Sequence, residues 1–307
     1  MKKILLIGGN GYIGSFLSLN LKDKYDIKIV DLNWFNDSVN EYDFKDLTDS
    51  YIKEFDVVLL LAGHSSVKMC DTDMLSSFNN NVNNFIQLVS KLNKSQKFIY
   101  ASSSSVYGHT GNSIVDETFK GFEPNNYYDL SKQIIDMYVT KNDINYYGLR
   151  FGTVNGWSPR LRSDIMINAM VNSAKNDGHI KLYIKDIMRP ILGIKDLCRA
   201  IEAIIDCDVD KRGIYNLASF NNTSEGIAKG VSSIINMPVV EYNVSDLEKI
   251  TNVKLQTTAY NFAIDSSKFE NEFDFKFNET IESITKSLVD GFENCDKTNR
   301  NIIKIYE

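Results

Sequence analysis

Three glycines near the start of the sequence have the spacing of a phosphate-binding turn. Gly8, Gly11 and Gly14 follow a continuous apolar run at residues 4–7, and apolar positions at helical spacing come after them. A strand, a glycine turn and a helix in this order form the dinucleotide-binding fingerprint. In that fingerprint Gly8 would permit the tight turn, Gly11 would let the backbone approach a pyrophosphate, and Gly14 would let the helix lie close to the strand.

An acidic residue at the end of the next predicted strand narrows the choice of dinucleotide. The amides of Tyr12 and Ile13 would hold the phosphates, because a helix N-terminus carries partial positive charge. Asp31 lies 17 residues after Gly14, close to where a carboxylate accepts hydrogen bonds from the adenosine ribose. A carboxylate there repels a 2′-phosphate, and residues 32–34 include no arginine. The sequence therefore predicts NAD in preference to NADP, and disfavours a glycine turn without a ligand.

A tyrosine and a lysine four residues apart form the second candidate set. Tyr128 and Lys132 share one face of a predicted helix, and the strand before it ends in the serine run 102–105. For tyrosine to act as a base near pH 7, its pKa must fall by about 3 units, or roughly 4 kcal/mol. A cation about 4 Å away, at an effective dielectric of about 20, supplies about 4 kcal/mol. Lys132 alone is therefore expected to activate Tyr128, and the serine context favours a reactive site over a solvated helix pair.

Composition limits the classes of function. The 307-residue chain is 43% hydrophobic and 24% charged, with a net charge of −6, which is typical of a globular protein and argues against broad binding to nucleic acid or an anionic membrane. No apolar run approaches the roughly 20 residues of a membrane span. Four cysteines without C-x-x-C spacing predict a reducing, cytoplasmic location, and three scattered histidines predict no metal site. The serine run lacks the G-x-S-x-G elbow of a covalent nucleophile.

Strands and helices that alternate along the chain must position these residues. Expected strands cover residues 4–7, 26–31, 56–63, 97–103, 146–152, 179–184, 213–218 and 239–244, and expected helices 77–92, 127–141, 163–176, 195–206, 223–236 and 278–294. This order predicts an α/β fold with a doubly wound parallel sheet, the Rossmann architecture. We assign residues 1–156 to an NAD-binding domain whose sheet resumes around 191–218. Residues 157–190 and 219–307 would form mainly a smaller α/β substrate lobe.

Several short motifs occur in a fixed order along the chain. They are GGNGYIG at 8–14, LAG at 61–63, NV at 81–82, SSSSVYG at 102–108, YDLSK at 128–132 and LRFG at 149–152, with MRP at 188–190 and Asp196 as weaker matches. With these motifs the chain resembles the extended short-chain dehydrogenases, the NAD-dependent epimerase/dehydratase group that acts on nucleotide sugars. The resemblance covers nearly the whole chain.

The resemblance implies a role for each of the three central residues. Ser103, three residues before the valine of the Val-Tyr-Gly motif, would hold the substrate hydroxyl. Tyr128 would take the proton of that hydroxyl while carbon C4 of the sugar gives hydride to NAD. Lys132 would hold the nicotinamide ribose and lower the pKa of Tyr128.

The resemblance also implies binding residues around this centre. The expected adenine contacts are Asp46 and Leu47, and the expected wall beside the ribose is Leu61, Ala62 and Gly63. The expected substrate contacts are Ser103, Ser104, Thr153, Arg162 and Arg189. Arg189 would grip the nucleotide diphosphate, whereas the sequence leaves open whether Arg160 and Arg162 assist or are surface charges.

Three departures from the family pattern shape the expected reaction. Ser104 and Ser105 replace the Asp-Glu pair of sugar-nucleotide 4,6-dehydratases, and a serine hydroxyl cannot serve as that acid or base near neutral pH. Thr153 stands where many members have asparagine, and residues 184–187 replace the usual glycine-rich turn. The chain is therefore expected to be a 4-epimerase or a 4-dehydrogenase in surface-polysaccharide sugar synthesis. A 4-keto sugar reductase and a non-catalytic NAD-binding regulatory protein are the alternatives.

The resemblance finally predicts a homodimer. Helices near 79–93 and 127–141 would pack on one flank, where the family forms a four-helix interface.

Overall fold

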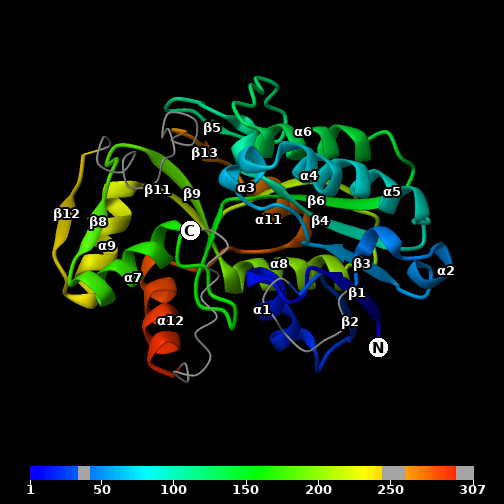
Figure 1. Ribbon diagram of the computed structural model, residues 1–307, viewed down its shortest axis with the longest axis horizontal. Helices are drawn as coiled ribbons and strands as arrows, with labels where there is room; N and C mark the ends of the chain where they lie inside the picture. The colour runs from blue at the N-terminus through cyan, green and yellow to red at the C-terminus, as the bar shows by residue number, and fades with distance from the viewer. Residues whose placement is uncertain (34–41, 244–259, 295–307) are drawn as a thin grey trace.

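A six-stranded parallel sheet forms the centre of the molecule (Figure 1). The computed structural model describes residues 1–33, 42–243 and 260–294. In sheet order the strands are β10 (Gly213–Leu217), β6 (Asn145–Phe151), β4 (Lys97–Ser103), β3 (Val57–Leu60), β1 (Lys3–Ile7) and β2 (Asp26–Val30). The neighbours of β1 are β2 on one side and β3 on the other, so the topological switch point lies beside β1. Ligands bind at the carboxyl ends of the strands at such a point, and the glycine turn follows β1 there. The predicted doubly wound parallel sheet is confirmed.

Helices cover both faces of the sheet, which explains the unbroken apolar run in β1. Ile4 and Leu6 pack toward one face and Leu5 and Ile7 toward the other, and all four are almost fully buried. One face carries α1 (Tyr12–Leu21), α8 (Ile194–Asp206) and α11 (Ser267–Phe273), and the other α2 (Asp49–Ile52), α5 (Asn84–Lys91) and α6 (Tyr127–Val139). A strand that is buried on both faces needs continuous apolar residues instead of alternating ones.

The segment predicted as one helix at 77–92 is divided. The chain forms α3 (Val67–Thr72), α4 (Met74–Phe78), a π-helical turn at Asn79–Asn83 and then α5. The side chain of Asn81 folds back onto the loop after β3: its Oδ1 accepts from the backbone N of His64 at 2.8 Å, and its Nδ2 donates to the His64 carbonyl at 3.0 Å. The irregular turn therefore fixes a loop that borders the cleft described below.

A smaller lobe lies beside the sheet (Figure 1). Its strands are β7 (Thr153–Asn155), β9 (Met188–Gly193) and β11 (Phe220–Thr223) in one sheet, and β8 (Ile180–Leu182) with β12 (Val239–Glu241) in another. Its helices α7 (Met166–Asp177), α9 (Ser224–Ile235) and α12 (Ile281–Asn294) share one apolar core with β8. A further pair, β5 (Ile114–Val115) and β13 (Ala263–Ile264), joins segments from the two halves of the sequence. The predicted strand 179–184 is thus β8 and the predicted strand 239–244 is β12, while β5, β7, β9, β11 and β13 were not predicted.

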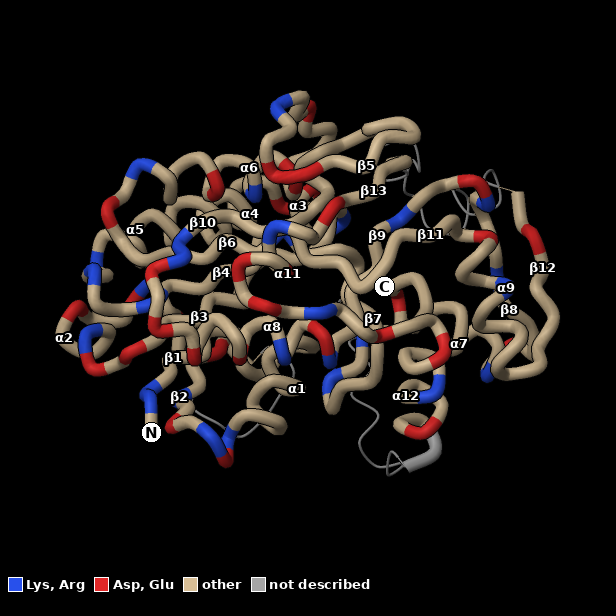
Figure 2. The backbone as a smooth tube through the Cα atoms, turned by 180° about the vertical axis from the view of Figure 1, so that it is seen from behind, with Lys and Arg blue, Asp and Glu red and all other residues tan. Residues whose placement is uncertain are grey.

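The surface of the described residues mixes both signs of charge. Figure 2 shows Lys and Arg interleaved with Asp and Glu over both lobes. None of the helices in the described parts of the chain has the length and apolar content that crossing a membrane requires.

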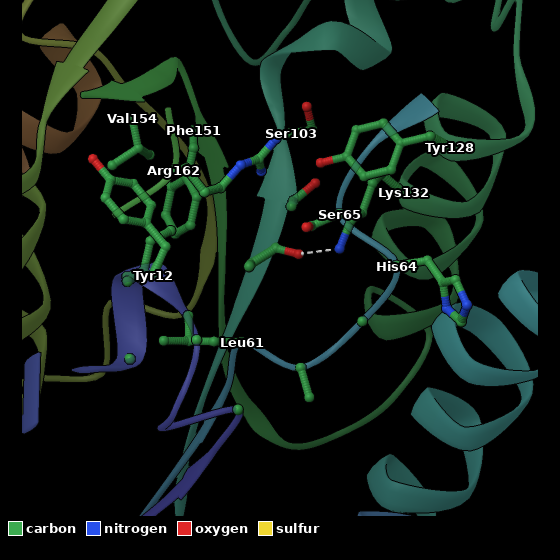
Figure 3. A pocket seen from close by; sticks show the side chains of 18 of the residues that line it. Tyr12, Leu61, His64, Ser65, Ser103, Tyr128, Lys132, Phe151, Val154 and Arg162 are labelled. Atoms are coloured by element: carbon green, nitrogen blue, oxygen red, sulfur yellow. Dashed lines mark hydrogen bonds between the residues drawn. The ribbon is translucent and has the colours of Figure 1, made fainter. Parts of the chain in front are cut away.

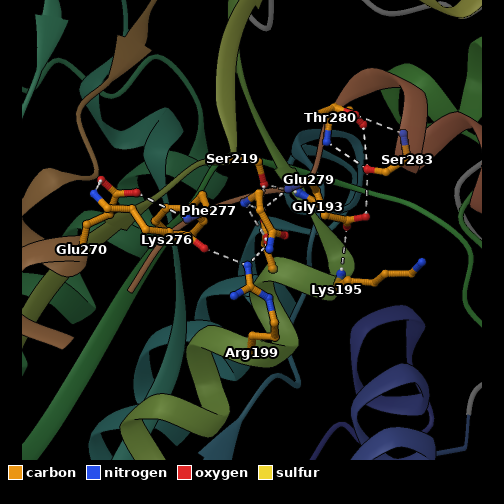
Figure 4. A network of polar contacts seen from close by, with 12 residues as sticks. Gly193, Lys195, Arg199, Ser219, Glu270, Lys276, Phe277, Glu279, Thr280 and Ser283 are labelled. Atoms are coloured by element: carbon orange, nitrogen blue, oxygen red, sulfur yellow. Dashed lines mark hydrogen bonds and ion pairs between the residues drawn. The ribbon is translucent and has the colours of Figure 1, made fainter. Parts of the chain in front are cut away.

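The buried carboxylate of Asp196 joins the small lobe to the sheet, in a network of polar contacts in which Figure 4 shows Arg199, Ser219 and Glu279. Asp196, fully buried in the first turn of α8, accepts hydrogen bonds from Ser219 Oγ at 2.7 Å and from the backbone N of Glu279 at 2.9 Å. It also accepts from the backbone N of Asn278 at 3.0 Å and from the guanidinium of Arg199. One side chain thus holds together the start of α8, the segment after β10 and the segment before α12.

We predict that Asp196→Ala lowers the free energy of unfolding by about 3 kcal/mol, because it strands buried donors and leaves the Arg199 guanidinium without this partner. Urea denaturation measures the change. The matched control is Glu282→Ala in the first turn of α12, where the carboxylate forms an exposed ion pair with Lys286; an exposed ion pair contributes roughly 0–1 kcal/mol. Equal losses in the two variants would contradict the structural role of Asp196.

Candidate active site

A cleft of about 350 Å³ lies over the carboxyl ends of the sheet strands and extends to the small lobe. Most of the residues singled out from the sequence line it. They are Gly8, Gly11, Tyr12, Ile13, Gly14, Asp31, Leu61, Ala62, Gly63, Ser103, Ser104, Tyr128, Lys132, Thr153, Arg162 and Arg189. The fold therefore brings into one cleft residues that are spread over more than half of the sequence.

The glycine turn has the geometry that its sequence predicts. Gly8 has a φ of +89°, and a Cβ there would lie 2.5 Å from the backbone N of Ala62. A Cβ on Gly14 would lie 2.2 Å from the carbonyl O of Gly8, so α1 could not approach β1. A Cβ on Gly11 would meet only Gly8 O, at 3.5 Å. Packing within the protein does not require glycine at position 11, and its open side faces the cleft, which suits close approach of a pyrophosphate.

Asp31 is held rigidly at the end of β2. Its Oδ2 accepts from the backbone N of Asn10 at 2.8 Å, and its Oδ1 accepts from the backbone N of Asn33 at 2.9 Å. A carboxylate has about four acceptor positions, so both oxygens keep capacity for ribose hydroxyls. The glycine turn and Asp31 together fit the pyrophosphate and the adenosine ribose of NAD.

The two expected adenine contacts do not reach the cleft. Asp46 is exposed on the 3₁₀ turn Phe44–Asp46, and Leu47 is buried in the core beneath the sheet. Tyr42 and Phe44 line this side of the cleft instead. The short turn directs Phe44 inward, where it packs in the core, and Asp46 toward solvent. The trace between residues 34 and 41, including Trp34, lies outside the described residues.

Tyr128 and Lys132 lie one turn apart at the start of α6. Asn126 caps this helix by accepting from the backbone N of Asp129 at 2.9 Å. Lys132 Nζ donates to the Ala101 carbonyl in β4 at 2.8 Å and lies 5.8 Å from the centre of the Tyr128 ring. Figure 3 shows the Tyr128 hydroxyl pointing into the cleft on the side of Ser103, with Arg162 reaching toward it from the opposite wall.

Burial, and not the lysine, dominates the acidity of Tyr128. With protein groups alone, burial raises the pKa of Tyr128 to about 12, against a lowering by its hydrogen bond with Ser103. Burial likewise lowers the pKa of Lys132 to about 8. The expectation that Lys132 alone activates Tyr128 is therefore wrong. The ammonium of Lys132 is bound to the Ala101 carbonyl and lies over the Tyr128 ring. The loss of hydration on burial destabilises the phenolate more than this cation stabilises it.

The serines after β4 have different partners. Ser104 Oγ donates to the Phe151 carbonyl at 2.7 Å and is almost fully buried, so its proton serves a bond between neighbouring strands. Ser103 lies at the edge of the cleft, with its Oγ 2.7 Å from the Oγ of Ser105. Ser105 Oγ in turn donates to Asp129. The sequence did not indicate this link to Asp129, because the pattern of serines alone does not say which way each hydroxyl points.

The predicted substrate side of the cleft contains both arginines. Arg162 donates to the Asp164 carboxylate at 2.6 and 3.0 Å, and Arg189 lies 5.8 Å from the centre of the Phe262 ring. Burial lowers the pKa of Arg189 to about 10, which leaves it charged at neutral pH. Both line the cleft, whereas Arg160 is not among its lining residues. Within the described residues, no group of three or more His, Cys, Asp or Glu side chains is placed to hold a metal ion.

Comparison with known proteins places this cleft in a family. Residues 4–218 match the NAD dependent epimerase/dehydratase family. The chain belongs to this family. The prediction of an extended short-chain dehydrogenase and the prediction of NAD as cofactor are thereby confirmed, since the family is NAD dependent.

Individual members of the family differ in the reactions that their names give. UDP-glucose 4-epimerase of Mycoplasma genitalium is 32% identical over 180 residues, which are 50% of this chain and 53% of that protein. ADP-L-glycero-D-manno-heptose-6-epimerase of Brachyspira hyodysenteriae is 27% identical over 268 residues, 78% of this chain and 83% of that protein. The first of these matches therefore spans only about half of the relative.

Solved structures of the family share the fold. The UDP-glucose 4-epimerase of Thermus thermophilus, in complex with NAD, has a TM-score of 0.78 and 18% identity, covering 96% of this chain and 100% of that one. A UDP-glucose-4-epimerase from Stenotrophomonas maltophila, with NAD and formylated UDP-arabinopyranose bound, has a TM-score of 0.81 and 17% identity, covering 95% and 98%.

The lowered pKa of Lys132 predicts a pH-dependent stability difference. Between about pH 8 and 10.5 the unfolded chain holds the Lys132 proton and the folded protein has released it, so the free energy of unfolding rises with pH in that window. From pH 7 to pH 10.5 the free energy of unfolding of the wild type should rise by about 3 kcal/mol relative to that of Lys132→Met. Urea denaturation of both proteins at several pH values measures the difference. A difference that stays constant with pH would contradict the burial of a charged lysine.

Proposed function

We propose that the protein is an NAD-dependent oxidoreductase of nucleotide-diphosphate sugars that abstracts hydride from sugar carbon C4, as a 4-epimerase or a 4-dehydrogenase in surface-polysaccharide sugar synthesis. One observation carries the proposal. The Tyr128 hydroxyl, Ser103 and Lys132 converge in the same cleft as the glycine turn and Asp31. A group that can hold a reacting hydroxyl therefore lies beside the place where a dinucleotide fits.

Three side chains have separate roles in the oxidation of a substrate hydroxyl. The oxidised nicotinamide, when bound, accepts the hydride and adds a positive charge near Tyr128. Ser103 holds the substrate hydroxyl, Tyr128 receives its proton, and Lys132 is positioned by Ala101 to bind the nicotinamide ribose. Because protein groups alone leave the pKa of Tyr128 at about 12, its ability to receive a proton depends on bound cofactor.

The opposite wall of the cleft suits a nucleotide diphosphate. Arg162 and Arg189 both line this wall, Arg189 lies over the Phe262 ring, and Thr153 adds a hydroxyl donor. Names of the relatives, UDP-glucose 4-epimerase and ADP-heptose 6-epimerase, support a nucleotide sugar and favour epimerisation. A dehydratase is disfavoured by Ser104 and Ser105, and an NADPH-linked reductase is disfavoured by Asp31.

Replacing the Tyr128 hydroxyl tests the proposal. Tyr128→Phe should lower turnover about 10²–10⁴-fold, the usual size of a general acid–base contribution, while NAD affinity stays within about threefold because the ring is retained. The probes are UDP-glucose, UDP-glucuronic acid and UDP-N-acetylglucosamine, with NAD binding followed by calorimetry. The control is Tyr127→Phe, whose side chain is 47% exposed on the same helix.

The form of the products separates the remaining alternatives. Reduced nicotinamide that accumulates, seen by absorbance, indicates a 4-dehydrogenase; altered sugar stereochemistry without it, seen by NMR, indicates a 4-epimerase. Bound NAD with no turnover of any sugar would favour the regulatory protein. A near-normal rate for Tyr128→Phe would remove the role assigned to Tyr128.

We further propose that the protein is a homodimer through the flank that the sequence predicts, formed by α5 and α6, together with the neighbouring α4. Large apolar side chains are exposed there: Met74 and Phe78 on α4, and Tyr127 and Met137 on α6. Exposed apolar clusters of this kind mark interaction surfaces, and a second copy of the chain would cover them with a self-complementary face.

Size-exclusion chromatography with light scattering tests the dimer. A 34.9 kDa chain should elute at about twice its mass, as expected for a twofold assembly, and Met137→Arg should shift it toward the monomer by placing a charge in the interface. The control is Leu19→Arg on α1, which is also partly exposed. A wild-type protein that elutes with the mass of a monomer at micromolar concentration would contradict the proposed homodimer.

A further inference from the structure

A group of buried polar side chains joins the start of α1 to the small lobe. It consists of Tyr12, the first residue of α1, Ser158 in the segment before α7, and Asn168 in the first turn of α7. Their hydrogen bonds cross from one lobe to the other. We refer to these three residues as the inter-lobe clasp. Buried polar groups that find partners fix the arrangement of the elements that carry them.

Tyr12 contacts the small lobe at two points. Its hydroxyl donates to the carbonyl of Gly156 at 2.7 Å, and its own carbonyl accepts from Ser158 Oγ at 2.6 Å. Ser158 Oγ also lies 3.0 Å from the Oγ of Ser15, one turn further along α1. The backbone amide of Tyr12 is at the N-terminus of this helix, where the pyrophosphate of a dinucleotide fits. One residue therefore links the glycine turn to the small lobe.

Asn168 holds both ends of the segment 156–162, which we call the arginine loop. Its Oδ1 accepts from the backbone N of Gly156 at 2.9 Å, and its Nδ2 donates to the carbonyl of Arg162 at 2.9 Å. The Nδ2 also donates to the Tyr12 hydroxyl at 3.2 Å. A side-chain amide has one acceptor oxygen and two donor hydrogens, and these bonds use all three. Asn168 thus ties the arginine loop to Tyr12.

The last residue of the arginine loop reaches the substrate side of the cleft. Arg162 lines the cleft, and Figure 3 shows its side chain extending into it from the side on which Tyr12 lies. Its Nε and Nη2 donate to Asp164 at 3.0 and 2.6 Å, which uses two of the five N–H donors of a guanidinium. The Arg162 side chain is only 15% exposed. Of the two interpretations that the sequence left open for Arg162, this placement favours a part in binding over a surface charge.

We propose that Tyr12 and Asn168 are positioning residues for Arg162, and that Arg162, so placed, binds the diphosphate of the nucleotide sugar. The inference rests on the proposed function and deepens it. Asn168 does not line the cleft and acts only through the arginine loop, while the Tyr12 hydroxyl is directed to Gly156. The same hydrogen bonds thus set the substrate cation relative to the glycine turn, and with it the substrate relative to the cofactor.

An arginine that is already held in place binds an anion better than one on a loose loop. Less side-chain freedom is lost when the anion arrives, and the paired bonds of a guanidinium to phosphate oxygens require a fixed direction. Loss of a clasp residue should therefore weaken the binding of a diphosphate, although it removes no group that touches the diphosphate.

The binding of UDP and ADP, which carry the diphosphate without the sugar, tests the inference. Calorimetry is carried out with saturating NAD, so that the adenosine site of the cofactor is occupied. Asn168→Ala should weaken the binding of the nucleoside diphosphate about 10-fold or more, and Tyr12→Phe about fivefold, the effect of one neutral hydrogen bond. The affinity for NAD should stay within about threefold, because both variants keep the backbone amides of the glycine turn.

A double-mutant cycle shows whether these effects pass through Arg162. Arg162→Met alone should weaken binding about 10-fold or more, since it removes charge-assisted hydrogen bonds to phosphate. Adding Asn168→Ala or Tyr12→Phe to Arg162→Met should then weaken binding by less than about twofold, because the side chain that they position is gone. The matched control is Asn176→Ala at an exposed position of the same helix, which should bind like the wild type.

The outcomes separate this role from the proposed function. A merely structural clasp residue would lower the free energy of unfolding and leave the affinity of the folded protein unchanged. If Asn168→Ala fails to fold, Tyr12→Phe decides alone. Unchanged affinity in the clasp variants, full losses that persist without Arg162, or wild-type affinity in Arg162→Met overturns the positioning role and leaves the proposed function standing. A wild type that binds neither UDP nor ADP overturns both.

Discussion

The hydrogen bond from Lys132 to the Ala101 carbonyl is the contact on which the site depends. It ties the first turns of α6 to the end of β4, and these two elements carry Tyr128 and Ser103. Tyr128 and Ser103 stand on different elements, and this bond sets the helix against the strand at the end of the sheet where both side chains lie. The bond comes at a cost, since an ammonium removed from water loses solvation that one carbonyl does not replace.

This loss of solvation also shifts the pKa values of the ionisable side chains in the site. Burial raises the pKa of the phenol and lowers the pKa of the amine, so both groups are nearer to neutrality than in water. A cation brought into this setting acts through a low dielectric and has a larger effect than it would at the surface. Protein groups alone therefore keep the Tyr128 phenol neutral at neutral pH and bring the pKa of Lys132 to about 8.

Much of the fold followed from local patterns. The apolar run before Gly8 and the glycine spacing predicted the first βα unit, and Asp31 lines the cleft beside this unit because it directly follows β2. Features that depend on distant neighbours were not predicted. The π-helical turn at Asn79–Asn83 exists because Asn81 binds the His64 loop, and periodicity cannot register such a contact. Asp46 is exposed and does not line the cleft, because the direction of the short turn Phe44–Asp46 depends on the core that Phe44 packs against.

In the candidate site, too, local patterns predicted some features, and features that depend on distant neighbours were missed. Residue types and spacing in the sequence identified Tyr128, Lys132 and Ser103 as candidates, and all three line the cleft. The pKa of Tyr128 was misjudged, because a sequence shows which charged residues lie a few positions away but does not show how much water burial has removed from them. Ser104 and Ser105 look equivalent in the sequence, yet one bonds a neighbouring strand and the other a buried acid.

The fixed orientation of Asp31 has a consequence for how fast and how firmly a dinucleotide is captured. Two backbone amides already restrain its χ angles, so little side-chain entropy is lost when the ribose arrives; immobilising a free side chain costs about 0.5–1.5 kcal/mol. Asp31 is therefore preorganised for the ribose contact that the sequence predicts, and a dinucleotide that makes this contact binds without first having to order the carboxylate.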